Sequence, residues 1–294
     1  MKSLLVSLSI LLSCPAWAEQ TITFAHYNLE NYLPMERKDH GQAVFAPKPE
    51  SEITPLLRII HEINPDILGV AEMGPPDQFG AFQGRLKAIG LDYPFAEYVN
   101  GPDPDRHIAL LSRFRIIARN SQPKVAFDLN GSVEAVRRGF LDVTVEVNPL
   151  CQLRLIGAHL KSKLPIPEGE FRVRWNEAQK LREYLDDVLI RNPDVCVVVY
   201  GDLNDTKDQP AIEEIAGPRE SPLHLIDLWL ADRQGDHWTY YRRFSDTYAR
   251  IDYILVNDRL SHSVERRKSY IYRSTDWNQA SDHRPIVAVI RTGD

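Results

Sequence analysis

Apolar residues recur along the chain with two different spacings, and these spacings predict a mixture of helices and strands. Residues 21–28 alternate between apolar and polar side chains, as a half-buried strand does. Residues 51–63 carry apolar side chains at helical spacing instead, with Ser51 as the expected N-cap. The same spacing predicts a second helix over residues 79–89 and the longest helix of the chain over residues 170–189.

Short runs of aliphatic and β-branched residues predict further strands, which cover residues 67–71, 107–112, 116–127, 138–147, 153–159, 195–200, 248–256, 263–271 and 286–290. The segments 248–256 and 263–271 are expected to pair with each other. Some consecutive predicted strands are separated by a helix, and others only by a short turn. Mixed sheets with helices outside them are therefore expected. The pattern therefore predicts an α/β fold, in which a two-sheet core would account for the length without a second domain.

The N-terminal residues have a different pattern, which predicts a secretory signal peptide over residues 1–18. A short basic start precedes the apolar stretch 4–12 and a small-x-small cleavage site at 16–18, so the mature chain is expected to begin at Glu19. A lipoprotein with an acylated Cys14 is the alternative. No later segment is apolar enough to span a bilayer. The protein is expected to be secreted or periplasmic.

Composition narrows the possible partners. The 294 residues include 43% hydrophobic and 26% charged residues, as in a soluble globular protein with a sizeable core. The formal net charge is −6, and removal of residues 1–18 would take away one Lys and leave −7. The overall basic field that favours tight nonspecific DNA binding is missing. A nuclease is not excluded, because a local basic rim can hold a strand beside an acidic metal site.

Six basic residues are candidates for such a rim, although a solvated surface would account for them equally well. They are Arg137, Arg138, Lys161, Lys163, Arg172 and Arg174.

Two cysteines remain after cleavage at Ala18, and both lie at the starts of predicted strands. If these strands are parallel neighbours, Cys151 and Cys196 approach each other, and an oxidising compartment would permit a disulfide. Two buried free thiols are the alternative. Zinc needs more ligands than this pair supplies.

Polar side chains that can carry chemistry collect where predicted strands end. The clusters contain His26 and Asn28, Glu72, His159, Asp202 and Asn204, and Ser281 with Asp282 and His283. A further carboxylate, Asp252, lies within a strand dense in apolar residues, where its burial is costly unless another group pairs with it. His283 is the candidate partner, because an Asp can orient an imidazole and stabilise its protonated form.

The residue types suit a hard divalent cation held by oxygen ligands. Glu72 and Asp282 supply carboxylates and Asn28 an amide carbonyl, a set that favours Mg²⁺, or alternatively Mn²⁺, over zinc. Phosphoryl chemistry needs such an ion, because negative charge builds on the phosphate oxygens.

The remaining polar residues then have roles in the same reaction. Asp202 is expected to position or deprotonate a water molecule, and Asn204 to donate a hydrogen bond to a phosphoryl oxygen. His159 and His283 are expected to contact the phosphate.

The order of these motifs resembles that of the endonuclease/exonuclease/phosphatase superfamily of DNase I-like, metal-dependent phosphoesterases. The resemblance extends from Asn28 to His283 and implies a four-layer α/β/β/α sandwich with two packed mixed β-sheets over residues 19–294. Asn28 matches the family's first-strand Asn, Glu72 matches its metal-binding Glu, and His159 matches the His of its nuclease branch. Asp202 and Asn204 match the family's Gly-Asp-x-Asn motif. Asp252 matches the Asp of its penultimate motif, and Asp282 with His283 matches its final Ser-Asp-His. The chain departs from the family at Tyr27, where Trp is usual, and at Ala71, where Gln is frequent.

Together these features predict an exported, magnesium-dependent phosphoester hydrolase. The matching His159 makes a phosphodiesterase with nuclease-like activity the first choice, so the substrate is a phosphoester that includes nucleic acid among its candidates. A phosphomonoesterase or a lipid-headgroup phosphodiesterase is the alternative within the enzymes, and a non-catalytic phosphate-ligand binding protein of the same fold is the alternative outside them. A monomer is expected.

Overall fold

The computed structural model describes residues 21–39 and 41–293 of the chain. The predicted signal peptide, the alternative lipidation site at Cys14 and the predicted mature start at Glu19 lie outside the described residues. None of the described helices is long and apolar enough to cross a membrane.

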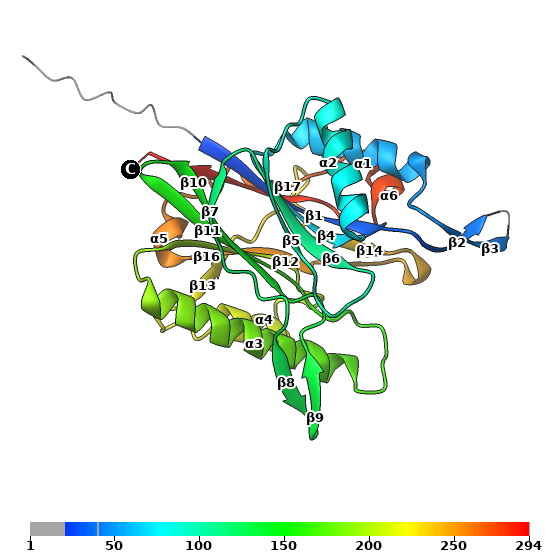
Figure 1. The fold of residues 1–294 in the computed structure, drawn as a ribbon. Coiled ribbons are helices and arrows are strands. Elements are labelled where there is room, and N and C mark those ends of the chain that lie inside the picture. Colours follow the sequence, from blue (N-terminus) through cyan, green and yellow to red (C-terminus); the bar gives the residue numbers. More distant parts are fainter. Residues whose placement is uncertain (1–20, 40, 294) are drawn as a thin grey trace, which may run out of the picture.

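Two six-stranded β-sheets pack face to face and form the core of the molecule (Figure 1). The first sheet has the order β17-β18-β1-β4-β6-β5, with β1 (Thr21–Tyr32), β4 (Ile67–Met73), β5 (Phe95–Val99), β6 (His107–Ser112), β17 (Tyr270–Ile271) and β18 (Ile286–Arg291). The second has the order β13-β16-β12-β11-β10-β7, with β7 (Arg115–Arg119), β10 (Phe140–Asn148), β11 (Cys151–His159), β12 (Cys196–Asp202), β13 (Leu225–Asp227) and β16 (Asp252–Asn257). Each sheet contains a parallel pair, β1 with β4 and β11 with β12, among antiparallel ones, so both sheets are mixed.

Helices cover the outer face of each sheet (Figure 1). The first sheet is covered by α1 (Glu50–Ile63) and α2 (Pro76–Ala88), and the second by α3 (Glu170–Arg191) and α4 (Pro210–Ala216). The shorter α5 (Asp258–Ser261) and α6 (Trp277–Ala280) lie within connections. This arrangement confirms the predicted four-layer α/β/β/α sandwich.

Three two-stranded hairpins lie outside the sheets. They pair β2 (Met35–Asp39) with β3 (Gln42–Ala46), β8 (Ala126–Leu129) with β9 (Ser132–Ala135), and β14 (Tyr240–Arg242) with β15 (Thr247–Ala249), and the 3₁₀ turn η1 (Arg243–Ser245) joins the last pair. Their strands are three to five residues long, too short to show a clear period. The sequence did not predict these hairpins, although the predicted strands 116–127 and 248–256 overlap β8 and β15.

The alternation of side chains along the strands explains why the layers form. In β1, Phe24 packs between the two sheets, while Ala25 and Tyr27 point to the opposite face and pack with α1 and α2. In β12, Val198 faces the other sheet, whereas Val199 packs beneath α3. Because both faces of each sheet are buried, both sets of positions must be apolar.

Several predicted elements are corrected by the structure. The segment 116–127 contains a break between β7 and β8, because Pro123 lacks the N–H that a continuous strand would need. The segment 248–256 is divided between β15 and β16, and the amide groups at the break donate to the hydroxyl of Thr239. Ser51 does not cap α1, which begins one residue earlier with Pro49 at the N-cap.

The predicted pairing of 248–256 with 263–271 is also wrong. Only Tyr270 and Ile271 of the second segment form a strand, β17, and it pairs with β18 of the first sheet. The polar residues before it form turns, in which Lys268 donates its backbone N–H to Glu265.

The two cysteines lie at the starts of β11 and β12, which are parallel neighbours as expected. Leu153, and not Cys151, is in register with Cys196, so the cysteines are offset by two residues. Both are half-buried free thiols, and burial, with a contribution from Cys196, raises the pKa of Cys151 to about 11.

Tyr200 of β12 fills the space between the sheets directly below the strand ends that carry the polar clusters. Its side chain is 2% exposed and packs edge-on against Phe24, with ring centroids 4.9 Å apart. Gly69 of β4 and Gly157 of β11 leave room for the ring: a Cβ atom would lie 2.3 Å from it at Gly69 and 2.7 Å from it at Gly157. Absence of a side chain at both positions is therefore a packing requirement.

We expect Gly69→Ala to lower the free energy of unfolding by about 1–3 kcal/mol, because the added methyl group overlaps the Tyr200 ring in a closely packed core. Urea denaturation monitored by circular dichroism measures this change. Gly80→Ala in α2 is the matched control, since a Cβ atom there meets no other atom within 4 Å. That control should be neutral or stabilise by up to ~1 kcal/mol. Equal effects of the two substitutions would contradict the packing argument.

Candidate active site

Strand register brings three of the predicted residues together at the ends of three adjacent strands of the second sheet. His159 ends β11 and lies opposite Asp202 at the end of the parallel strand β12. Asp202 in turn lies opposite Asp252 at the start of the antiparallel strand β16. The three residues thus occupy matching positions on three adjacent strands, and their spacing follows from the backbone hydrogen bonds.

The first sheet contributes the facing residues. Asn28 of β1 is in register with Ala71 of β4, and Glu72 follows at a β-bulge where both strands change register. Glu72 has a left-handed backbone conformation (φ 57°), which is uncommon for a residue other than Gly or Asn. Its Oε2 accepts the backbone N–H of Asn31 at 2.8 Å. A bulge turns a side chain away from the regular alternation, and here it holds Glu72 at the strand end.

Asp252 and His283 form a buried ion pair across the two sheets, as predicted. Nδ1 of His283 lies 2.8 Å from Oδ2 of Asp252, and Nε2 of His26 lies 3.4 Å from Oδ1 of the same carboxylate. Burial alone would lower the pKa of His283, but the carboxylates of Asp252 and Asp202 outweigh it and hold that pKa well above its ordinary value. Burial would likewise raise the pKa of Asp252, yet His283 and His26 hold it far below its usual range. The pair is therefore imidazolium and carboxylate.

Asp202 lies at the centre of the cluster. Its Oδ2 accepts the side-chain amide of Asn28 at 3.0 Å and lies 3.6 Å from Nε2 of His159 and 3.7 Å from Nε2 of His283. Its Oδ1 accepts the backbone N–H of Asn204 at 3.0 Å. Burial, together with the negative charges of Asp252 and Glu72, raises the pKa of Asp202 to about 7 against the opposing charge of His283.

His159 is in the opposite electrostatic situation from His283. It is buried, and desolvation together with the positive charges of Arg138 and His283 holds its pKa well below the ordinary value. His159 is therefore a neutral imidazole at neutral pH, beside an imidazolium at His283.

Three half-buried carboxylates, Glu30, Glu72 and Asp282, lie beside the cluster and form what we call its acidic mouth. Burial and the charges of Glu30 and Glu72 raise the pKa of Asp282 to about 7, and burial also raises the pKa of Glu30. Carboxylates that are half-buried together repel one another, and a divalent cation is the partner that removes this repulsion. The mouth therefore fits the predicted cation, with Glu72 and Asp282 as its carboxylate ligands.

Ligand atoms of Asp202, Asp252 and His283 also lie within 4.8 Å of one another and could in principle hold a metal ion. In this trio, however, His283 and Asp252 already share a hydrogen bond and compensate each other's charge. A cation there would have to displace that proton. Hard cations also prefer oxygen ligands to imidazole, so the acidic mouth is the better site.

Asn28 has a contact that the sequence did not predict. Its amide nitrogen donates to Asp202, and its carbonyl oxygen accepts the backbone N–H of Glu30 at 3.0 Å. The structure thus shows Asn28 orienting Asp202, while its place among the metal ligands remains a prediction.

A cavity of about 510 Å³ opens over the cluster, and residues of the β14–β15 hairpin form part of its lining. Six of the eight predicted site residues line it: Glu72, His159, Asp202, Asn204, Asp282 and His283. Asn28 and Asp252 lie behind this lining and contact Asp202 and His283. The volume is in the range of small-ligand sites.

Other residues of the site were not predicted. Tyr240 lies against the His283 ring with centroids 4.8 Å apart, and Ser281 donates to the backbone carbonyl of Asn28 while it accepts the N–H of His283. His26 shares the inward face of β1 with Asn28, two residues on, and this period-two spacing could have identified it. Nothing local to Tyr240 indicates its contact, which arises where its loop forms a bridge to His283.

Known proteins share the sequence pattern and the fold of this chain. The sequence model of the Endonuclease/Exonuclease/phosphatase family matches residues 26–283, which include every residue of the cluster. The chain belongs to the endonuclease/exonuclease/phosphatase family. No curated protein matches it in a sequence search.

Solved structures of this family share the fold. The human Nocturnin catalytic domain with a bound sulfate anion is 21% identical, with 95% of this chain and 99% of that one covered and a TM-score of 0.65. Truncated TDP2 from Caenorhabditis elegans is 17% identical, with 92% and 98% covered and a TM-score of 0.60. Sphingomyelinase C from Streptomyces griseocarneus is 16% identical, with 92% and 99% covered and a TM-score of 0.56. The TM-scores show a common fold despite these low identities.

We expect Asp252→Asn to lower the pKa of His283, because it removes the carboxylate that favours the charged imidazole. In the chelator-treated wild-type protein, the ring should stay protonated well above pH 6.5. NMR titration of the histidine rings measures both values. An unchanged His283 pKa in the variant would contradict the ion pair.

We expect Mg²⁺ or Mn²⁺ to raise the midpoint of thermal unfolding of chelator-treated protein by about 5 °C at 100 times Kd, since a ligand of the native state adds ~2.7 kcal/mol at that ratio. Asp282→Asn should abolish most of this shift, because it removes a carboxylate of the mouth. Asp246→Asn, in the exposed turn after η1, should retain it. Equal shifts in both variants would exclude the acidic mouth as the cation site.

Proposed function

We propose that this protein is an exported, Mg²⁺-dependent phosphodiesterase with nuclease-like activity. The observation that carries the proposal is the position of Asp202, which lies between two imidazoles and next to an acidic mouth suited to a cation. Members of this family are in general hydrolytic phosphoesterases, and the family has metal-dependent members. Export rests on the signal-peptide pattern at residues 1–18.

In the proposed mechanism, Asp202 positions the attacking water and accepts its proton. A pKa of about 7 allows it to act as a base at neutral pH, and Asn28 and the backbone of Asn204 keep both of its oxygens in place. A bound divalent cation, held by Glu72 and Asp282, would neutralise the charge that develops on the phosphoryl oxygens.

The imidazoles supply hydrogen bonds from the protein side. Asp252 engages Nδ1 of His283, which leaves Nε2 directed toward Asp202 and the cavity, where it can donate to a phosphoryl or leaving oxygen. Neutral His159 offers a second contact, and its low pKa limits the positive charge in the pocket. Asn204 uses one amide hydrogen on the backbone carbonyl of Leu160, so its other hydrogen can donate to a phosphoryl oxygen.

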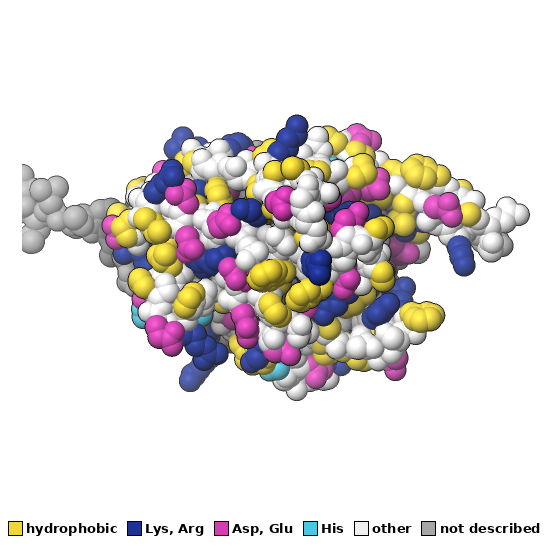
Figure 2. All heavy atoms as spheres, turned by 90° about the horizontal axis from the view of Figure 1, so that it is seen from below, with side chains coloured by type: hydrophobic (Ala, Val, Ile, Leu, Met, Phe, Trp, Pro, Cys, Tyr) yellow, Lys and Arg dark blue, Asp and Glu magenta, His cyan; other side chains and the backbone are white. Residues whose placement is uncertain are grey.

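Surface charge limits how a nucleic acid could bind. The face seen from below in Figure 2 intersperses acidic and basic side chains, and the chain as a whole carries a net charge of −6. Electrostatic attraction over this face would be weak. In the proposal, substrate recognition therefore depends on the cavity, and the protein acts as a monomer.

We expect the protein without residues 1–18 to hydrolyse bis-p-nitrophenyl phosphate with Mg²⁺ and to stop when EDTA is added. Asp202→Asn and His283→Ala should each lower kcat by about 10²- to 10⁴-fold, the usual contribution of an acid–base group. Release of p-nitrophenol measures the rate, and circular dichroism verifies the fold. Near-normal turnover in either variant would overturn the assignment.

The substrate class needs a panel of DNA, RNA, sphingomyelin, inositol phosphates and simple monoesters. Preferential cleavage of DNA or RNA supports the nuclease-like proposal. Faster hydrolysis of monoesters or of sphingomyelin would replace it by a phosphomonoesterase or a lipid-headgroup phosphodiesterase. No hydrolysis of any of these substrates by folded, metal-loaded protein would favour a binding protein of the same fold.

A further inference from the structure

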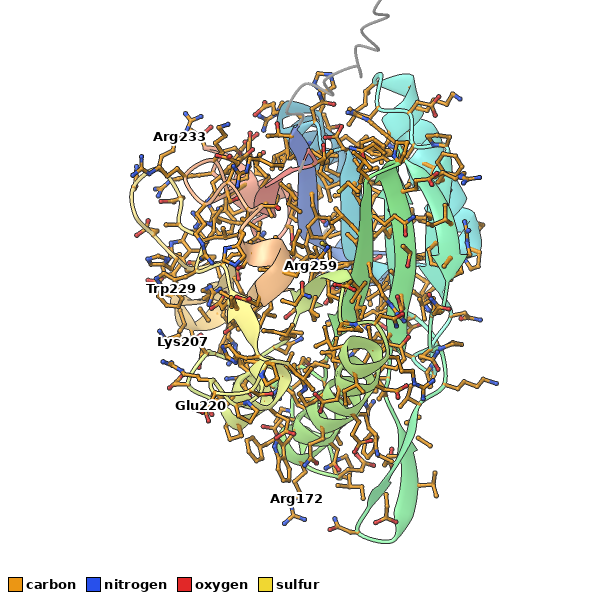
Figure 3. The ribbon with its side chains drawn as sticks, turned by 90° about the vertical axis from the view of Figure 1, so that its left-hand side faces the viewer. Arg172, Lys207, Glu220, Trp229, Arg233 and Arg259 are labelled. Carbon is orange, nitrogen blue, oxygen red and sulfur yellow. The ribbon has the colours of Figure 1, made fainter. Side chains whose placement is uncertain are left out.

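Only part of the predicted basic rim reaches the cavity. Arg172 is exposed, and its side chain extends from α3 into solvent (Figure 3). Arg174 is buried and pairs with Asp205 at 2.9 Å, and Nζ of Lys161 donates to backbone carbonyls of its own loop. Of the six candidates, the cavity lining contains Arg138 and Lys163.

Arg138 is buried without a full set of partners. Its side chain is 7% exposed, and Nη2 lies 3.1 Å from Oδ2 of Asp103. Among the residues that the structure describes, Nε and Nη1 of Arg138 have no hydrogen-bond partner. Buried guanidinium N–H groups without acceptors are unfavourable. A residue that lines a cavity in this state is suited to an anionic ligand that enters the cavity.

The structure fixes the backbone of the segment that carries Arg138. Glu177 of α3 is fully buried and accepts the backbone N–H groups of Arg137 at 2.9 Å and of Lys161 at 2.6 Å. One carboxylate thus fixes the segment that carries Arg138 and the segment that follows His159. Gly101 packs against the backbone of Arg138 so closely that a Cβ atom there would lie 2.5 Å from it. Arg138 therefore belongs to a rigid wall.

Further basic side chains line the same cavity. They are Arg106, Lys163 and Arg242. Arg106 is oriented by its bond to the side chain of Asn31 at 2.8 Å, and Lys163 lies 2.8 Å from Asp205. The cavity therefore combines the acidic mouth, which suits a cation, with a basic wall, which suits an anion.

We infer that Arg138 binds a second anionic group of the substrate, adjacent to the phosphoester that is cleaved, so that the preferred substrates carry two neighbouring phosphoryl groups. This inference rests on the proposed function. The reacting phosphoryl group has its own partners in the cation, His283 and Asn204. A nucleic-acid strand and a phosphorylated small molecule share the required chemistry.

Matched substrates with the same scissile bond test this inference. The thymidine dinucleotide dTpdT contains one phosphodiester, and its 5′- or 3′-phosphorylated forms add a second anion on one side. We expect one phosphorylated form to have a kcat/KM at least about tenfold higher in the wild type, the scale of a charge-assisted hydrogen bond. Glycerophosphoinositol with and without a ring phosphate provides the non-nucleotide pair. Whichever pair shows the larger preference indicates whether the second phosphate belongs to a nucleic-acid strand or to a phosphorylated small molecule.

Arg138→Gln should reduce this preference to near unity, mainly through KM. Removal of a positive charge beside His159 acts on dTpdT and on its phosphorylated forms alike, so that effect cancels in the preference. Arg138→Lys, which retains the charge, should recover part of the preference and covers the case in which the Gln variant fails to fold. Arg172→Gln, with the same loss of charge on an exposed residue, should keep the full preference. An equal loss on dTpdT and its phosphorylated forms would overturn the inference, because Arg138 would then act on the reacting phosphoryl group.

A binding measurement separates this inference from the proposed function. With EDTA present, isothermal titration calorimetry should show pyrophosphate binding to the wild type and about tenfold weaker binding to Arg138→Gln. If no diester is hydrolysed but this difference holds, the proposed function fails and the anion site stands. Pyrophosphate binding that is equal in the two proteins would overturn the anion site.

Discussion

The site depends on two buried hydrogen bonds that join one sheet to the other. Asp252 at the start of β16 pairs with His283 in the segment that leads into β18, and Asp202 at the end of β12 accepts the amide of Asn28 in β1. Each bond links a strand of the second sheet to β1 or to the segment that leads into β18 of the first sheet, so the distances in the site are set by how the two sheets pack. Tyr200 and the glycines beneath it determine that packing just below the polar groups.

The same burial that orders these groups makes their charges costly. The pair Asp252–His283 lowers this cost internally, since a carboxylate and an imidazolium in contact stabilise each other. The carboxylate of Asp282 at the mouth has only a longer contact, 3.9 Å from its Oδ1 to Nε2 of His283, and burial with the neighbouring carboxylates shifts its pKa upward. A carboxylate whose charge is balanced by an imidazolium can orient that ring, whereas a carboxylate whose charge is poorly balanced is suited to bind a cation.

The cavity has an acidic part and a basic part. Carboxylates gather on one set of strand ends, while Arg106, Arg138, Lys163 and Arg242 line the same space from loops and hairpins. The strand ends are common to the fold, whereas the loops vary more freely in length and composition. A reaction centre on rigid strands and a recognition wall on loops is the arrangement expected of a family that cleaves different phosphoesters.

Much of this could be read from the sequence, because it depends on local patterns. Short aliphatic and β-branched runs, and alternation in the first strand, located most strands of both sheets, and the carboxylate, amide and imidazole residues at their ends identified the site. The short hairpins, the break at Pro123 and the true partner of β17 were missed, since strands of two to five residues are too short to show a period and a strand's own pattern does not identify its partner.

The sequence by itself determined which chemical groups the protein has and that they lie at strand ends. It could not determine that Asn28 orients Asp202, that Tyr240 packs on His283, or that one of the six basic candidates, Arg138, is buried at the cavity with unpaired N–H groups. These facts depend on contacts between residues far apart in the chain. Hydrogen bonds, desolvation and charge act over a few ångströms of space, and only the packed structure decides which groups come that close.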